Sequence, residues 1–248
     1  MVGVAAGLAT CGKIPFAASF AMFSAGRAFE QVRNSVGYPK LNVKIVGSHA
    51  GISVGEDGAT HQCCEDIALM RTIPGMVILN PCDHYEMQAA VRAAVEHKGP
   101  CYIRLGRLAV ESINNNDDYK FELGKGITLR EGTDITVVAT GLMVQEAVKA
   151  ADALKEEGIS VEVINIHTIK PLDEELVIAS AKKTGRVITV EEHNIIGGLG
   201  EAVAAVLSEK CPTKLHRIGV NDEFGHSGPA AALLKQFGLP FKNAKKNA

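Results

Sequence analysis

The chain has 248 residues, of which 46% are hydrophobic and 22% are charged, and its formal net charge is −2. This composition excludes a wholly disordered chain, and the near-neutral charge gives no reason to expect nucleic acid or a membrane surface as a partner. No apolar run reaches the roughly 18–20 residues of a membrane span, and Lys13 interrupts the apolar N-terminus, which argues against a secretory signal. Six cysteines without a CxxC spacing predict reduced thiols and a cytoplasmic protein.

Short apolar runs alternate with amphipathic helices in the first half of the chain. A β-like segment at 13–16 is followed by expected strands at 43–47, 76–79 and 101–103. Asp83, with Glu86 three residues later, predicts the start of a helix between the last two strands.

The same alternation resumes in the second half. Strands are expected at 134–139, 161–164, 187–190 and 214–219. Helices are expected from Val144 to Leu154, from the cap Asp173 to Thr184, and from Gly197 to about Ser208. The pattern predicts an α/β fold of two domains, each a largely parallel sheet flanked by helices.

A polar stretch without periodicity separates the two halves. We therefore expect a first domain at 1–110, a linker at 111–120, a second domain at 121–243, and a frayed polar tail at 242–248.

The segment 48–62 is the first candidate site, because it follows an expected strand, where open parallel sheets place their ligands. It contains His49, Asp57, Thr60 and His61 among several glycines. A long polar, glycine-rich segment is more often a binding loop than a plain connector. The plainer interpretation is that His49 caps the strand and that Asp57 lies in a surface turn. The spacing of the two histidines does not match a metal motif.

Three further segments are weaker candidates. Phe20 and Phe23 could form a flat apolar slot for an aromatic ring, although phenylalanines at this spacing usually pack in a core. Arg104 and Arg107 follow a strand and could hold a phosphate, although a solvated arginine is the default interpretation. Glu191–Asn194 and the glycines of 197–200 are expected to serve packing or an interface.

Taken together, these segments resemble the C-terminal half of transketolase, over nearly the whole chain. The resemblance rests on Phe20, Phe23 and Arg27, on His49, on the string Gly-Glu-Asp-Gly-Ala-Thr-His at 55–61, on Arg107, and on Val190–His193 with Gly-Gly-Leu-Gly at 197–200. It implies a pyrimidine-binding domain for thiamine diphosphate, lacking its N-terminal part, followed by a transketolase C-terminal domain. It also implies transfer of a glycolaldehyde unit from a ketose phosphate to an aldose phosphate, as in the pentose phosphate pathway.

The resemblance assigns roles to individual residues. Phe20 and Phe23 would line the aminopyrimidine slot. Asp57 would contact the hydroxyl next to the reacting carbonyl, and His61 would lie near the donor carbonyl. His49 and Arg107 would grip the sugar phosphate.

The chain departs from the family at its N-terminus. By the resemblance, the glutamate that activates the cofactor should precede Met1, and the diphosphate and Mg²⁺ site should lie in an N-terminal section. We therefore expect the isolated chain to be inactive and to assemble with an N-terminal section, as a homodimer or an α2β2 complex that acts on sugar phosphates.

Three alternatives stay open. The chain could belong to a 1-deoxy-xylulose-5-phosphate synthase, although His49 favours transketolase. It could be the E1 beta subunit of a 2-oxo-acid dehydrogenase, which lacks the Asp-Gly-Ala-Thr-His string. It could also be a degenerate subunit that only assembles.

Overall fold

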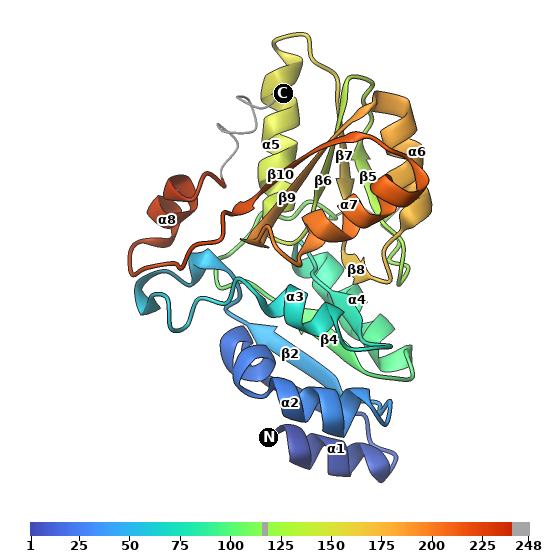
Figure 1. Cartoon of the computed structure of the whole chain (residues 1–248), viewed down its shortest axis with the longest axis vertical. Helices are drawn as coiled ribbons and strands as arrows, with labels where there is room; N and C mark the ends of the chain where they lie inside the picture. The colour runs from blue at the N-terminus through green and yellow to red at the C-terminus, as the bar shows by residue number, and fades with distance from the viewer. Residues whose placement is uncertain (116–118, 240–248) are drawn as a thin grey trace.

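The computed structural model describes residues 1–115 and 119–239 of the chain as two five-stranded sheets flanked by helices (Figure 1). The first sheet has the order β1-β2-β4-β3-β8, and the second has the order β10-β9-β6-β7-β5. Four strands of each sheet are parallel, and only the strands β8 and β5 run antiparallel to their neighbours. The predicted fold class is therefore confirmed.

The strands are short and mostly buried, as apolar β-branched runs between two helical layers should be. Their bounds are β1 (Phe16–Phe20), β2 (Lys44–Ser48), β3 (Val77–Leu79), β4 (Cys101–Arg104), β5 (Ile127–Arg130), β6 (Ile135–Ala139), β7 (Val161–Asn165), β8 (Thr168–Lys170), β9 (Arg186–Asn194) and β10 (Lys214–Val220).

The helices cover the faces of both sheets. Those of the first half are α1 (Val2–Thr10), η1 (Met22–Arg27), α2 (Phe29–Gln31), η2 (Val32–Gly37), η3 (Ile52–Asp57), α3 (Asp66–Arg71) and α4 (His84–Glu96). Those of the second half are α5 (Met143–Lys155), α6 (Glu174–Thr184), α7 (Leu199–Lys210) and α8 (Ala230–Gln236). None of these helices has the length and apolarity that crossing a membrane requires.

Side-chain caps fix two helix starts that the sequence predicts. Asp83 accepts the backbone N–H of Glu86 at 2.9 Å, and Asp173 accepts that of Leu176 at 3.1 Å. The other carboxylate oxygen of Asp83 accepts the backbone N–H groups of Ile113 and Asn114. The first residues of the expected linker are therefore bound to the start of α4, whereas linker residues 116–118 and the expected tail at 242–248 lie outside the described residues.

The first strand differs from the expectation. It spans Phe16–Phe20 rather than 13–16, because pairing with β2 begins where Phe16 lies opposite Lys44, just after Pro15. Phe20 therefore ends a strand, and Phe23 lies in the π-helical turn η1, so the two rings are not one turn apart on a helix. Glu191–Asn194, expected to follow a strand, instead form the second part of β9.

The two halves share the first sheet. β8 comes from the second half of the sequence and pairs antiparallel with β3 of the first half. The ammonium of Lys170, the last residue of β8, donates to the carbonyl oxygens of Arg71 and Ile73 at 2.7 Å each. The division at 111–120 remains a prediction, and the sheet itself extends across it.

The start of α7 explains the glycines at 197–200. Glu191, buried on β9, accepts the backbone N–H groups of Leu199 and Gly200 at 2.7 Å each, so a carboxylate caps the positive end of the helix. A Cβ atom on Gly198 would overlap this carboxylate. The packing role expected for this segment agrees with the geometry.

We predict that Gly198→Ala lowers the free energy of unfolding by about 2–3 kcal/mol, as overpacking of a filled site typically does. Gly7→Ala is the matched control, because no atom lies within 4 Å of the new Cβ and alanine favours a helix. Urea unfolding monitored by circular dichroism measures both. Equal stability of the two variants would contradict the packing argument.

Candidate functional site

Four aromatic rings gather where β1 and β2 end. The two strands are parallel neighbours in which Phe20 lies opposite Ser48, so Phe20 and His49 emerge side by side. Their rings stack with centroids 4.0 Å apart and planes 10° apart. Phe23 is parallel to Phe20 at 6.0 Å, and His61 meets both phenylalanine rings edge-on, at 6.1 Å and 5.3 Å. We call Phe20, Phe23, His49 and His61 the aromatic cluster.

Each imidazole of the cluster keeps one nitrogen free. His49 Nδ1 lies 3.0 Å from the Ser48 hydroxyl, and His61 Nδ1 lies 3.0 Å from the Thr60 hydroxyl. The Nε2 atoms of the two rings hydrogen bond to none of the described residues. Both half-buried rings can therefore offer a hydrogen bond to a ligand through Nε2.

The segment from His49 to Gln62 carries both imidazoles and is called the substrate loop below, after the role that we propose for it. It contains the short 3₁₀ turns of η3, interrupted at Gly55, and its backbone has a positive φ at His49, Gly51, Gly55 and Gly58. Left-handed backbone is easy for glycine and strained for histidine, and such strain is common at functional sites. Asp57 is exposed on this loop, and its carboxylate contacts no partner among the described residues.

Arg107 lies against the substrate loop, and none of its described hydrogen bonds or ion pairs reaches the aromatic cluster. Its guanidinium donates to the Val54 carbonyl and pairs with Glu56 at 3.3 Å. Both side chains of this pair are largely exposed, so the ion pair is weak and a phosphate could replace Glu56.

The structure thus brings Phe20, Phe23, His49 and His61 together and places Asp57 and Arg107 on or against the same loop. Arg27 lies beside the aromatic cluster, with its guanidinium 4.8 Å from the centre of the Phe23 ring. Among residues 1–115 and 119–239, no three His, Cys, Asp or Glu side chains gather as a metal site.

Arg104, considered beside Arg107 as a phosphate ligand, has a different environment. It is buried, and its Nε donates to Asp66 at 2.9 Å. Its Nη2 donates to the backbone carbonyl of Glu192 at 2.8 Å, across to the second half. The phenol of Tyr102 donates to the same Asp66 oxygen at 2.7 Å, and burial, more than the Asp66 charge, raises the pKa of this phenol. The guanidinium of Arg104 is therefore buried and bound to partners inside the protein. The interpretation of this residue as a solvated or phosphate-holding arginine is wrong.

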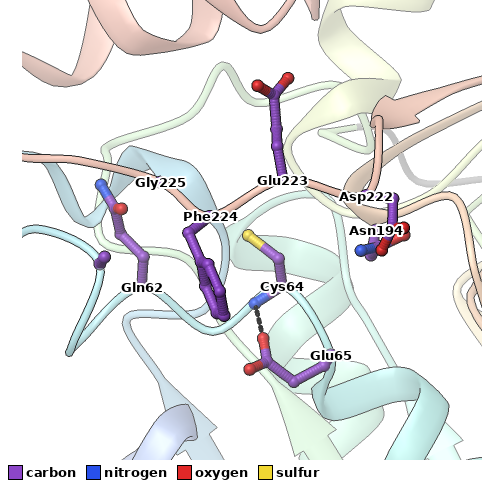
Figure 2. Close-up of a pocket in the computed structure, with 9 residues that line it drawn as sticks. Gln62, Cys64, Glu65, Asn194, Asp222, Glu223, Phe224 and Gly225 are labelled. Carbon is purple, nitrogen blue, oxygen red and sulfur yellow. Dashed lines mark hydrogen bonds between the residues drawn. The ribbon is translucent and has the colours of Figure 1, made fainter.

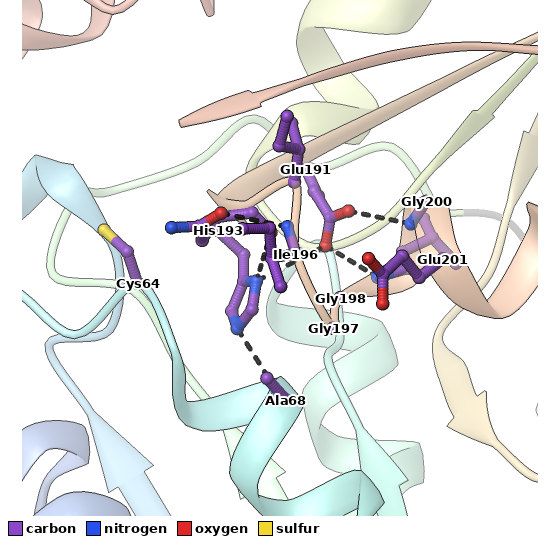
Figure 3. A network of polar contacts seen from close by, with 12 residues as sticks. Cys64, Ala68, Glu191, His193, Ile196, Gly197, Gly198, Gly200 and Glu201 are labelled. Atoms are coloured by element: carbon purple, nitrogen blue, oxygen red, sulfur yellow. Dashed lines mark hydrogen bonds and ion pairs between the residues drawn. The ribbon is translucent and has the colours of Figure 1, made fainter. Parts of the chain in front are cut away.

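A second polar contact between the halves involves His193 of β9 (Figure 3). Its Nδ1 lies 2.6 Å from the Asn194 carbonyl and must donate to it, which leaves Nε2 to accept the Ala68 N–H at 3.3 Å. The ring is therefore neutral, and burial lowers its pKa to about 4. The sequence offered no signal for this contact, because Ala68 and His193 are 125 residues apart.

The adjacent thiols of Cys63 and Cys64 are poor candidates for chemistry. Both are free, and burial raises the pKa of each thiol, so the reactive thiolate is disfavoured. Cys64, together with Gln62 and Glu65, lines a cleft on the side of the C-terminal segment 222–225, where the Phe224 ring is exposed (Figure 2).

We predict an acid-sensitive contribution of His193 to stability. Its folded pKa lies below the unfolded value of 6.5, so its stabilisation is complete above pH 6.5 and is lost as the pH falls toward 4. Between pH 7 and pH 4 the free energy of unfolding of the wild-type chain should fall by about 2–3 kcal/mol more than that of the His193→Gln variant. Urea unfolding at the two pH values measures this difference. The exposed His216→Gln serves as control and should keep the wild-type pH dependence, whereas a wild-type dependence in His193→Gln would contradict the assignment.

Two family models match the chain. The one described as transketolase, pyrimidine binding domain, matches residues 1–112, and the one described as transketolase, C-terminal domain, matches residues 124–243. A protein of Methanocaldococcus jannaschii described as a transketolase C-terminal section is 54% identical over 99% of this chain and 78% of its own length. A Clostridium protein named as a 6-deoxy-6-sulfo-D-fructose transketolase subunit is 49% identical over 100% of this chain and 77% of its own length.

A solved structure agrees with these matches. The structure described as a split gene transketolase, inactive beta4 tetramer, superposes with a TM-score of 0.88 at 50% identity, covering 97% of this chain and 76% of that chain. The family models, the relatives and the solved structure lead to one conclusion: this chain belongs to the transketolase family.

Proposed function

We propose that this chain is the C-terminal subunit of a two-polypeptide transketolase that moves a glycolaldehyde unit from a ketose phosphate to an aldose phosphate. The observation that carries the proposal is the aromatic cluster, in which two imidazoles with free Nε2 atoms stand beside two parallel phenylalanine rings. Membership in a thiamine-diphosphate-dependent family supports it.

The residues present fit one side of the cofactor. The half-buried rings of Phe20 and Phe23 are parallel within 9° and offer a flat apolar surface of the kind an aminopyrimidine ring packs on. Thiamine diphosphate, when bound, would supply the carbanion chemistry. We assign its diphosphate and Mg²⁺ to residues of an N-terminal section.

The protein's own residues would bind and orient the sugar. His61 would hold or transfer a proton at the donor carbonyl oxygen through Nε2, and Asp57 would accept a hydrogen bond from the neighbouring hydroxyl. His49 and Arg107 would bind the phosphate, and binding remote from the reacting carbon fixes the orientation of the sugar. The stack on Phe20 holds the His49 ring in one plane for this contact.

The substrate is a phosphorylated or similarly anionic ketose, because Arg107 and His49 favour an anionic end group. The relative named for 6-deoxy-6-sulfo-D-fructose indicates that a sulfonate is a donor worth comparing. The six free cysteines support a reducing compartment, the cytoplasm.

The proposal is tested by reconstitution. The chain is mixed with an N-terminal section, thiamine diphosphate and Mg²⁺, and transfer is measured with xylulose 5-phosphate plus ribose 5-phosphate, and with 6-deoxy-6-sulfo-D-fructose as the alternative donor. Turnover of pyruvate plus glyceraldehyde 3-phosphate instead would identify the synthase. We expect transfer only by the mixture, so turnover by the isolated chain would refute its dependence on a partner.

In this reconstituted enzyme, His61→Ala should lower kcat/KM by a factor of about 100 or more, as expected for loss of a proton-transferring group. His216→Ala, an exposed histidine on the other half, should leave the rate unchanged. Undiminished transfer by His61→Ala would favour a subunit that only assembles.

Helix α1 supports assembly with a partner. None of its nine residues is charged, and Val2, Ala5 and Ala6 face the core. Val4 and Leu8 on the outer side are 69% and 45% exposed. An uncharged helix with an uncovered apolar face is typical of a surface that another chain covers.

We predict that Leu8→Glu weakens association with the N-terminal section, or of the chain with itself, at least tenfold. A buried charge without a partner at an interface costs more than the 1.4 kcal/mol that this factor requires. Sedimentation velocity of the mixture measures it. Val95→Glu, at a similarly exposed valine on α4, is the control, and identical assembly of the two variants would exclude α1 from the interface.

A further inference from the structure

The substrate loop is attached at its first end to a side chain of the second half. Glu192 lies on β9, and its Oε1 accepts the backbone N–H of Ser53 at 2.5 Å, with both residues buried. A Cβ atom on Gly51 would overlap the Glu192 carboxyl, so only glycine fits there. Gly51 and Ser53 come two and four residues after His49, and Glu192 therefore fixes the backbone directly behind the first imidazole.

The other end of the loop is attached by the C-terminal segment. The side-chain amide of Gln62 donates to the carbonyls of Ile52 and His226 at 3.1 Å and 3.0 Å. A Cβ atom on Gly225 would overlap Gln62, and Figure 2 shows the two residues side by side. Because Gln62 follows His61 directly, the second imidazole is also positioned by the second half.

Two contacts attach the middle of the loop. The Ser227 hydroxyl donates to the Glu56 carbonyl at 2.6 Å. Ile52 is fully buried in a core cluster made mostly of second-half residues, among them Val220 and Leu233. In Figure 1, α8 lies against this loop at the side of the molecule.

The chemistry-bearing side chains take no part in these contacts. Apart from the ring contacts within the aromatic cluster, the described side-chain hydrogen bonds of His49 and His61 go only to the hydroxyls of Ser48 and Thr60. Their relative placement is therefore set by the backbone of the loop, which the second half holds at the contacts above and the first half holds through Arg107 and Leu105.

We propose that Glu192 is a positioning residue for the transfer reaction, and that the second half contributes to catalysis by holding the substrate loop through Glu192 and the Gln62 contacts. The inference rests on the proposed function. Small displacements of positioned groups cost up to about 100-fold in rate. Loss of the Ser53 contact should thus reduce catalysis beyond any loss of folded protein.

The test compares Glu192→Ala, Glu192→Gln and Glu191→Ala. Glu191 is the matched control, because it is an equally buried carboxylate on the neighbouring residue, and its hydrogen bonds lie wholly within the second half. The alanine variants both destabilise the chain. Glu192→Gln retains an oxygen acceptor for the Ser53 N–H and should therefore retain most of the activity that Glu192→Ala loses.

In the reconstituted enzyme, with rates normalised to folded protein, Glu192→Ala should lower kcat/KM for the donor by at least tenfold, while Glu191→Ala keeps the wild-type value. Glu192→Gln should recover to within about threefold of wild type. Equal losses in both alanine variants, or no rescue by glutamine, would overturn the proposal.

A second measurement does not depend on activity. In the isolated full chain, the Cε1–H resonances of His49 and His61 report the ring environment and the pH titration of each imidazole. Glu192→Ala should shift both resonances and Glu191→Ala neither. Unchanged resonances would overturn the positioning role, whereas an inactive wild-type mixture with the expected shifts would overturn only the proposed function.

Discussion

The buried guanidinium of Arg104 connects the two halves, because it pairs with Asp66 of its own half and donates to the Glu192 carbonyl of the second half. Arg104 ends β4 and Asp66 begins α3, and the guanidinium also reaches the backbone of β9 in the second half. A buried ion pair contributes little net stability, but removing one partner leaves an uncompensated charge in the interior. The main effect of the pair is therefore to fix where β4, α3 and β9 lie relative to one another. With Arg104 fixed, β9 must pass beside the substrate loop, and Glu191, Glu192 and His193 take their positions from it.

Successive residues of β9 then serve different neighbours, because side chains alternate between the faces of a strand. Glu191 turns to the start of α7, and Glu192 turns to the substrate loop. The result is a loop whose backbone is held by buried groups and whose candidate site side chains, His49, Asp57 and His61, take no part in holding it. This separation suits catalysis, since pre-positioned groups need no reorganisation when a substrate binds.

The sequence predicted what depends on local pattern. Periodicity located most strands, and the caps Asp83 and Asp173 located two helix starts, because the residues involved are near neighbours in the chain. The glycine-rich segment was predicted to be a site from the same kind of local pattern, and this remains a prediction. The burial of Arg104, the Glu192 contact and the strands β5 and β8 were not predicted. Each depends on partners tens of residues away, and β8 has only three residues. The local sequence around an arginine at the end of a strand does not indicate whether its guanidinium is solvated or pairs with a buried aspartate.

The short strand β8 also bears on how the chain reaches its folded state. Until residues 168–170 have left the ribosome, β3 has one unpaired edge, and open edges invite pairing with other chains. The sheet of the first half is thus completed only when much of the second half already exists. A gene break placed between the halves would leave β3 with an unpaired edge in one polypeptide and β8 without its pairing strand in the other.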